Sequence, residues 1–82
     1  MISLTLYTTI GCHLCELADT LLNELSNQHN VVVEAIEIGD DDELVTRYGT
    51  IIPVVRFADN SELNWPFTLQ DLEIKIGPLS TH

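Results

Sequence analysis

The chain has 82 residues, and its 13 Asp and Glu outnumber three Lys and Arg, which gives a formal net charge of −10. This charge excludes a nucleic-acid-binding protein and a protein held on an anionic membrane, because both need a positively charged surface. Hydrophobic residues make up 45% of the chain, so we expect one folded domain over residues 1–82, with residues 78–82 as a short tail. No apolar run is long enough to span a bilayer, and the first four residues lack the basic segment of a secretory signal.

The N-terminal part of the chain predicts a strand followed by an amphipathic helix. Apolar and polar residues alternate over residues 2–7, as is typical of a β-strand, and residues 8–11 should form a turn. Residues 12–28 then show helical periodicity. The apolar stripe expected on this helix consists of Leu14, Leu17, Ala18, Leu21, Leu22 and Leu25. The β-branched residues over 31–38 predict a second, buried strand.

The main acidic run, residues 39–43, has two interpretations. Carboxylates are favoured at a helix N-terminus, and Asp40 with Glu43 has the spacing of a capping box, so the run predicts the start of a short helix. A calcium site is the alternative, although the run lacks the alternating ligands of an EF-hand loop. The helix should end at Gly49. Its inward side chains should be Leu44, Val45 and Tyr48.

The C-terminal part of the chain begins with a predicted hairpin. Residues 51–57 are rich in β-branched and apolar side chains and predict a third strand, with Pro53 near its start. Residues 58–61 are typical turn residues, and they lead into a short fourth strand over residues 62–64. The hairpin makes these two strands antiparallel, whereas the first two strands, joined by a crossover helix, should be parallel.

A last helix should follow, capped by Thr68 with Asp71 three residues later and ended by Gly77 and Pro78. Its buried face should consist of Leu69, Leu72 and Ile76. The element order is then βαβ-α-ββα. The sequence therefore predicts an α/β fold with a four-stranded mixed sheet flanked by helices.

The two cysteines, Cys12 and Cys15, are the strongest candidates for chemistry. A disulfide between them would close too short a loop to constrain the unfolded chain much, so their spacing indicates redox chemistry or half of a metal site. They follow a strand and open a helix, where free backbone N–H groups and the helix dipole stabilise a thiolate. Cys12 is therefore the expected nucleophile. Cys15, one turn further and more shielded, is the expected resolving thiol that releases a mixed disulfide.

Charged neighbours should tune this pair. Glu16 lies four residues from Cys12 and Asp19 lies four residues from Cys15, and a nearby carboxylate disfavours a thiolate. His13 would favour the thiolate if it were protonated. The alternative for His13 is a solvated residue with no tuning role.

A metal site is the competing interpretation of the cysteine pair. Structural zinc takes four Cys or His ligands, and the chain offers two good ones, because His29 should lie at the far end of the first helix and His82 in the tail. We therefore expect neither a metal nor another cofactor in a single chain. The alternative function is a non-catalytic binding or assembly module, in which the cysteines bridge a metal or an iron–sulfur cluster to a partner.

Three elements of the sequence resemble the thioredoxin fold, and its glutaredoxin-like branch most of all: the strand at residues 4–7, the Cys12-x-x-Cys15 motif at a helix start, and Ile52-Pro53-Val54 opening a later strand. The similarity covers about residues 2–76. The resemblance implies that Pro53 is cis and packs against the cysteine turn, and that Ile52 offers its backbone to a substrate polypeptide.

The residues beside Cys12 complete the expected substrate-binding surface, which consists of Gly11, His13, Ile52 and Pro53. Trp65 and Phe67 have two interpretations. Aromatic side chains are mostly buried, so packing of the last helix against the sheet is preferred; an apolar wall near the active site is the alternative. The elements Cys-His-Leu-Cys, Ile-Pro-Val and Trp-Pro-Phe together resemble small bacterial glutaredoxin-like proteins.

The chain departs from glutathione-binding glutaredoxins at two places. These proteins usually carry a Lys shortly before the motif, where this chain has Thr-Thr-Ile at residues 8–10. They also hold glutathione with backbone N–H groups of a Gly-Gly-x-Asp element, but the matching region here, residues 64–68, contains Pro66, which has no N–H to donate. Because glutathione is anionic and this chain is acidic, we expect an activity that does not depend on glutathione.

These features predict a thiol–disulfide oxidoreductase in which Cys12 attacks a substrate disulfide and Cys15 resolves the adduct. The expected partners are a protein disulfide substrate or a thioredoxin-type reductant, with no nucleic acid and no membrane. We expect the reducing cytoplasm, because the chain shows no secretory signal and no further cysteines. A monomer is the expectation for a chain of this size.

Overall fold

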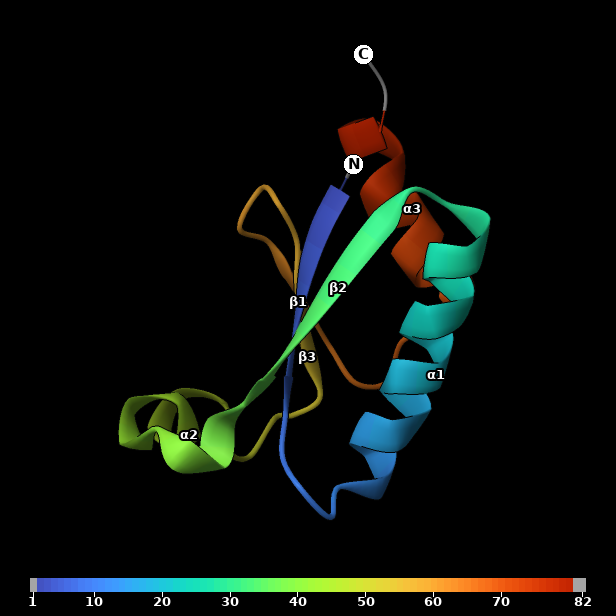
Figure 1. Ribbon diagram of the computed structural model, residues 1–82. Helices are drawn as coiled ribbons and strands as arrows, with labels where there is room; N and C mark the ends of the chain where they lie inside the picture. Colours follow the sequence, from blue (N-terminus) through green and yellow to red (C-terminus); the bar gives the residue numbers. More distant parts are fainter. Residues whose placement is uncertain (1, 81–82) are drawn as a thin grey trace.

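The computed structural model describes residues 2–80, with side chains through residue 77. Figure 1 shows a twisted sheet with helices packed mainly on one of its faces. In chain order the elements are β1 (Ile2–Thr8), α1 (His13–Gln28), β2 (Val31–Glu37), the 3-10 helix η1 (Ile38–Asp40), α2 (Asp42–Tyr48), β3 (Val54–Arg56), β4 (Glu62–Asn64) and α3 (Leu69–Ser80). This is the predicted element order with one short 3-10 helix added.

The four strands form one mixed sheet in the order β2-β1-β3-β4. β1 pairs with β2 in parallel from Ile2–Val31 to Thr8–Glu37. β3 pairs antiparallel with both β1 and β4. The predicted α/β fold with a mixed four-stranded sheet is thereby confirmed. Because β1 and β2 are parallel, their carboxyl ends meet at one edge, and the turn into α1 and the helix α2 both lie at this end (Figure 1).

The core lies between the sheet and the two helices α1 and α3. Alternate residues of β1, including Leu4 and Leu6, point toward these helices and are 1% exposed. Across from them lie the buried side chains of α1 and α3, which are Ala18, Leu22, Leu25, Leu72 and Ile76. Burying these side chains provides the main driving force for folding of this small chain.

The inward face of α1 differs from the predicted stripe. Cys15, Ala18, Leu22 and Leu25 are buried, whereas Leu14 and Leu17 are 43% and 42% exposed. The reason is that these four residues, spaced three or four apart, form the row that faces the sheet, while Leu14 and Leu17 lie on its flank. The start of α1 therefore presents Cys15 to the interior and apolar side chains to solvent.

The acidic run starts a helix as predicted, but with a different cap. Asp41, not Asp40, is the N-cap of α2, and its Oδ1 accepts the N–H groups of Glu43 at 3.0 Å and Leu44 at 3.2 Å. Asp40 is already part of η1, which takes over after β2 ends at Glu37. An Asp at the N-cap uses its side chain to satisfy helix N–H groups that have no backbone partner.

The end of α2 leads into β3 through a turn. Tyr48 is buried, but Val45, which was expected inward, is 43% exposed. Gly49 follows with an ordinary helical φ of −55°, and a Cβ there would lie 2.5 Å from the carbonyl oxygen of Val45. The N–H groups of Ile51 and Ile52 donate to the carbonyl of Tyr48, so these residues form a turn and not the first part of the third strand.

The last helix starts as predicted and ends later. Thr68 Oγ1 accepts the N–H of Asp71 at 3.1 Å, and Asp71 Oδ2 accepts the N–H of Thr68 at 2.9 Å, which is a reciprocal capping box. α3 then continues through Gly77 and Pro78 to Ser80, so the expected stop at these residues was wrong. Part of the clash that disfavours a helical residue before proline involves the Cβ of that residue, which Gly77 lacks. Of the expected tail, residues 78–80 are helical and residues 81–82 lie outside the described residues.

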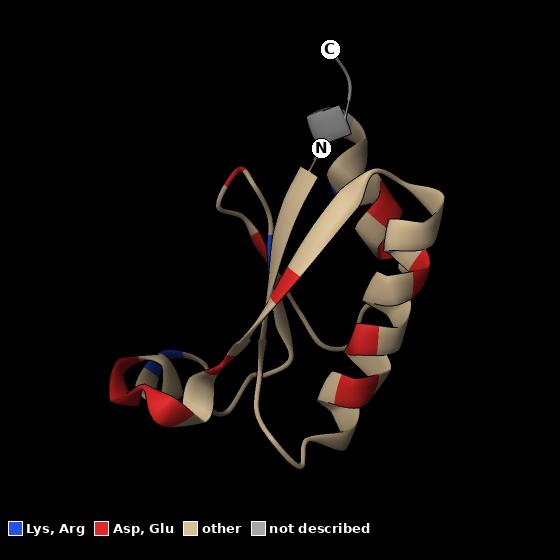
Figure 2. Ribbon diagram, viewed as in Figure 1, with Lys and Arg blue, Asp and Glu red and all other residues tan. Residues whose placement is uncertain are grey.

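Within residues 2–80, none of the helices has the length and apolar character needed to cross a membrane. The acidic residues are spread over α1, α2 and the strands, while Lys and Arg are few (Figure 2).

Candidate active site

The turn between β1 and α1 carries the two cysteines at the carboxyl end of the central strand. Gly11 has a φ of +80°, a left-handed conformation that glycine adopts without the steric cost of a Cβ. The N–H of Cys12 donates to the carbonyl of Thr9 at 3.4 Å, which closes the turn. Cys12 is then the N-cap of α1, so the helix begins at the first cysteine of the pair.

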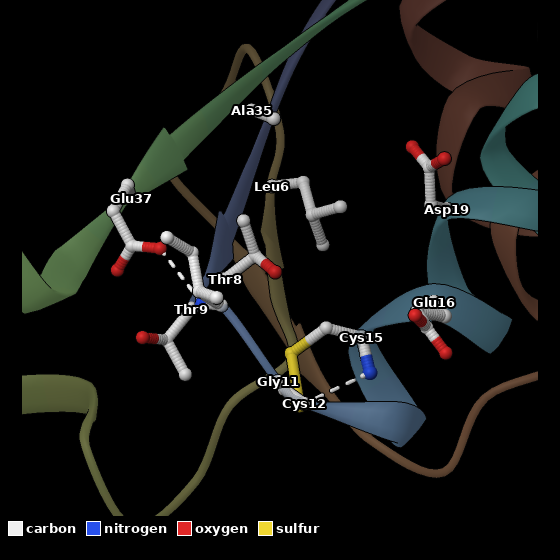
Figure 3. A pocket seen from close by; sticks show the side chains of 11 residues that line it. Leu6, Thr8, Thr9, Gly11, Cys12, Cys15, Glu16, Asp19, Ala35 and Glu37 are labelled. Atoms are coloured by element: carbon white, nitrogen blue, oxygen red, sulfur yellow. Dashed lines mark hydrogen bonds between the residues drawn. A yellow bond between two sulfur atoms is a disulfide. The ribbon is translucent and has the colours of Figure 1, made fainter.

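Cys12 and Cys15 are joined by a disulfide, with 5.2 Å between their Cα atoms (Figure 3). The Sγ of Cys12 accepts the N–H of Cys15 at 3.1 Å, which is the position that an N-cap oxygen takes in an ordinary helix. Cys15 is 3% exposed, whereas Cys12 is partly exposed. Cys12 is therefore partly open to solvent at the positive end of a helix, and Cys15 is buried behind it.

A cavity of about 390 Å³ opens beside this disulfide. It lies between the first turns of α1 and the carboxyl ends of β1 and β2, and we call it the disulfide cavity. Figure 3 shows most of the residues that line it. These are Leu6, Thr8, Thr9, Ile10, Gly11, Cys12, Cys15, Glu16, Asp19, Ala35 and Glu37.

Three carboxylates line the disulfide cavity, from two different elements. Glu16 and Asp19 come from α1, and Glu37 comes from the end of β2. Glu16 Oε2 lies 3.5 Å from Nδ1 of His13, and Asp19 Oδ2 accepts a long hydrogen bond of 3.5 Å from Asn23. The expected proximity of acidic side chains to the cysteine pair is therefore seen, and a third carboxylate adds to it.

Glu37 fastens the cysteine turn to the end of β2. Its Oε1 accepts the N–H of Ile10 at 2.8 Å, and its Oε2 accepts the N–H of Gly39 at 2.6 Å. The bond from Gly39, followed by one from the side chain of Thr9, lowers the pKa of Glu37 below its ordinary value of 4.5. Sequence reasoning missed this residue, because it is 27 positions from Ile10 and no local pattern links the two.

The Ile52–Pro53 peptide bond is cis, the configuration implied by the family resemblance. Pro53 is fully buried, and its carbonyl accepts the N–H of Trp65 at 3.1 Å. The Trp65–Pro66 bond is cis as well, which the sequence did not indicate. Ile52 packs beside the cluster formed by Tyr7, Ile38, Tyr48 and Val54. The disulfide cavity includes Gly11 but not Ile52, Pro53 or His13.

The two aromatic residues near the last helix pack in the core. Phe67 is 4% exposed, and the ring of Trp65 meets it edge to face with 5.1 Å between centroids. Trp65 is partly buried against the main core cluster. Neither residue lines the disulfide cavity, so this geometry favours the packing interpretation over an apolar wall.

The described side chains give little support to a metal centre. Across residues 2–77, no group of three or more Cys, His, Asp and Glu side chains is arranged to hold an ion. The side chain of His13 is 79% exposed, and His29 pairs with Glu73 at the other end of α1, 3.1 Å away. His82 lies outside the described residues.

A second polar cluster lies beside β3 and β4. Tyr48 stacks on Tyr7 with 4.2 Å between ring centroids and donates a hydrogen bond of 2.6 Å to Glu62. Burial, and then the hydrogen bond to this carboxylate, raises the pKa of Tyr48 to about 12. Arg56 donates to Asn60 at 2.8 Å in the same region.

The chain is similar to a known protein family and to solved structures. Residues 3–77 match the glutaredoxin-like domain (DUF836). The X-ray structure of the structural genomics target protein XcR50 from X. campestris is 33% identical, with a TM-score of 0.81 over 92% of this chain and 96% of that chain.

Thioredoxins are similar in fold alone. A mutant thioredoxin from Halobacterium salinarum NRC-1 is 20% identical, with a TM-score of 0.79 over 99% of this chain and 76% of that one. Oxidized thioredoxin O2 from Arabidopsis thaliana is 21% identical, with a TM-score of 0.69 over the same shares of the two chains. No curated protein matches this chain.

Proposed function

The chain belongs to the glutaredoxin-like domain family (DUF836), and on that basis we propose that it is a thiol–disulfide oxidoreductase whose reactive pair is Cys12 and Cys15. The observation that carries this proposal is the asymmetric disulfide at the start of α1. Cys12 is partly exposed and its sulfur accepts a helix N–H, while Cys15 is 3% exposed behind it. This arrangement supplies an attacking group and a resolving group in one motif.

The first step uses the reduced protein. The N–H of Cys15 and the helix dipole stabilise the Cys12 thiolate, which is the attacking form. The thiolate attacks one sulfur of a substrate disulfide, forms a mixed disulfide between that sulfur and Cys12, and expels the other substrate sulfur as a thiolate. Burial of Cys15 directs the incoming disulfide to Cys12.

In the second step Cys15 resolves this adduct. Its thiol loses a proton to solvent and attacks the Sγ of Cys12, which forms the Cys12–Cys15 disulfide seen here and releases the second substrate thiolate. The two cysteines are oxidised together, and the two electrons pass to the substrate. A dithiol of the thioredoxin type would then return the pair to the reduced state.

The substrate we propose is a protein disulfide rather than glutathione. Backbone N–H groups would be needed to bind the glutathione carboxylates, but the segment that should supply them contains Pro66, and the disulfide cavity is lined by carboxylates. Ile52, just before the cis Pro53, is the residue we expect to meet a substrate backbone.

A trapping experiment tests the proposal. The Cys15→Ser variant, reduced and mixed with a peptide disulfide, should accumulate a mixed disulfide at Cys12, because the resolving thiol is gone. The Cys12→Ser variant is the matched control and should form far less adduct, because Cys15 is buried. The proposal fails if Cys15→Ser forms no adduct, or if both variants form it equally.

A further inference from the structure

The disulfide cavity combines apolar walls with negative charge at the reacting group. Leu6 and Ala35 line it from β1 and β2, and the cysteine sulfurs lie at its edge (Figure 3). Its volume, about 390 Å³, lies at the lower end of the range of roughly 300–1,000 Å³ for ligand sites. A cavity of this size can accept one long side chain from a substrate while the substrate disulfide meets Cys12.

Two of the three carboxylates that line the cavity, both on α1, are free to pair with an incoming charged group. Both carboxylate oxygens of Glu37 already accept backbone N–H groups. Among the described side chains, in contrast, Asp19 accepts one long bond from Asn23, and Glu16 has the exposed His13 as its one charged or polar partner. Glu16 and Asp19 are therefore available to a charged group that enters from solvent.

The basic residues of the chain lie elsewhere and do not neutralise this charge. Arg47 and Arg56 line a separate cavity of about 310 Å³ next to Tyr48 and Glu62. The Nζ of Lys75 lies 5.3 Å from the centre of the Phe57 ring. Figure 2 shows that α1 carries acidic residues and no Lys or Arg.

We propose that the disulfide cavity selects protein disulfides whose cysteine is flanked by Lys or Arg. The aliphatic stem of such a side chain would pack on Leu6 and Ala35, and its charged head would meet Glu16 and Asp19. The same carboxylates would repel an acidic flanking residue. This repulsion would increase the selectivity for basic over acidic substrates. This inference rests on the proposed oxidoreductase function and names its substrate class.

Exchange rates with three matched peptide disulfides test the inference. The peptides differ only in the residue beside the cysteine, which is Lys, Gln or Glu, and each rate constant is divided by that of dithiothreitol with the same peptide. This division removes the intrinsic reactivity of each disulfide. At low ionic strength we expect the Lys peptide to react about tenfold faster than the Glu peptide, since complementary charge acts mainly on the rate of association. The ratio should shrink in high salt, where the charges are screened.

Two sets of variants assign the preference to the cavity. Glu16→Gln with Asp19→Asn removes two of the three cavity charges at nearly constant shape and leaves Glu37 in place, and the Lys-to-Glu ratio should fall severalfold. Glu24→Gln removes one charge from an exposed position of the same helix outside the cavity, and it should leave the ratio unchanged. Because removing a carboxylate also favours the thiolate, all three rates can rise together, and the ratio is the quantity that decides.

The outcomes separate this inference from the function beneath it. Exchange with all three peptides at equal normalised rates, or a faster Glu peptide, would overturn the charge selectivity and leave the oxidoreductase intact. A preference for Lys that is undiminished in the double variant would overturn its assignment to Glu16 and Asp19. No exchange with any peptide would overturn both proposals.

Discussion

Gly11 offers a direct test of how the turn before the reactive cysteine is built. Its φ is +80°, and a Cβ added to it would have no neighbour within 4 Å. The cost of Gly11→Ala is therefore conformational and not steric. A left-handed backbone costs an L-residue roughly 1–2 kcal/mol. The lower entropy of the unfolded alanine chain returns about 0.4–1 kcal/mol.

The net expectation for Gly11→Ala is a loss of about 1 kcal/mol in the free energy of unfolding. This corresponds to roughly a fivefold change in the unfolding equilibrium. For a domain of this size, it would lower the melting temperature by about 4–8 °C. Gly11→Asn should lose less, because asparagine tolerates the left-handed region better than alanine.

Urea and thermal unfolding of the disulfide form, followed by circular dichroism, would measure both variants in one redox state. The order of stability expected is Gly, then Asn, then Ala. Two results would refute the conclusion that a left-handed Gly11 sets the turn. One is an alanine variant as stable as the wild type, and the other is an asparagine variant less stable than the alanine variant.

Two further predictions concern pH. The hydrogen bonds from the N–H of Gly39, the side chain of Thr9 and the N–H of Ile10 lower the pKa of folded Glu37 below 4.5, so the stability it contributes is present above this pH and is lost as the pH falls through the folded pKa. Glu37→Gln should be less stable near neutral pH and should show a flatter loss of stability in acid, measured by urea unfolding across this range. Tyr48 has its pKa raised from 10 to about 12 by burial and by Glu62, so its contribution is complete below pH 10 and is lost as the pH rises toward 12. Tyr48→Phe should flatten the alkaline fall in stability, and an unchanged alkaline limb would contradict this assignment.

The parts of the fold that follow from local patterns could be predicted from the sequence. The alternation in β1, the periodicity of α1 and the turn before β4 all depend on residues close together in the chain. The same holds for the capping box of Thr68 and Asp71, whose two hydrogen bonds span three residues. Helix-start placement of Cys12 is also local, and the structure confirms it with the N–H of Cys15 on its sulfur.

The errors in the predicted fold arose where tertiary packing, or competition between adjacent residues for one role, determines the structure. Cys15 is buried on the inward face and Leu14 and Leu17 are not, an error that arose because the predicted apolar stripe included both leucines and left out the cysteine. Asp41 and not Asp40 is the N-cap of α2, because Asp40 is the last residue of η1. The disulfide cavity, and the hydrogen bond from Ile10 to Glu37 beside it, bring β2 against a turn that is far away in sequence. No local sequence motif could therefore predict them.

The central claim is that Cys12 and Cys15 exchange electrons as one pair, and a redox titration tests it most directly. The protein would be equilibrated with graded ratios of reduced and oxidised dithiothreitol, its thiols trapped, and the products counted by mass spectrometry. Both cysteines should become trapped together in one two-electron transition, with about 30 mV for each tenfold change in the equilibrium. A pair that stays unchanged across all ratios, and that also fails to exchange with a thioredoxin system, would contradict it.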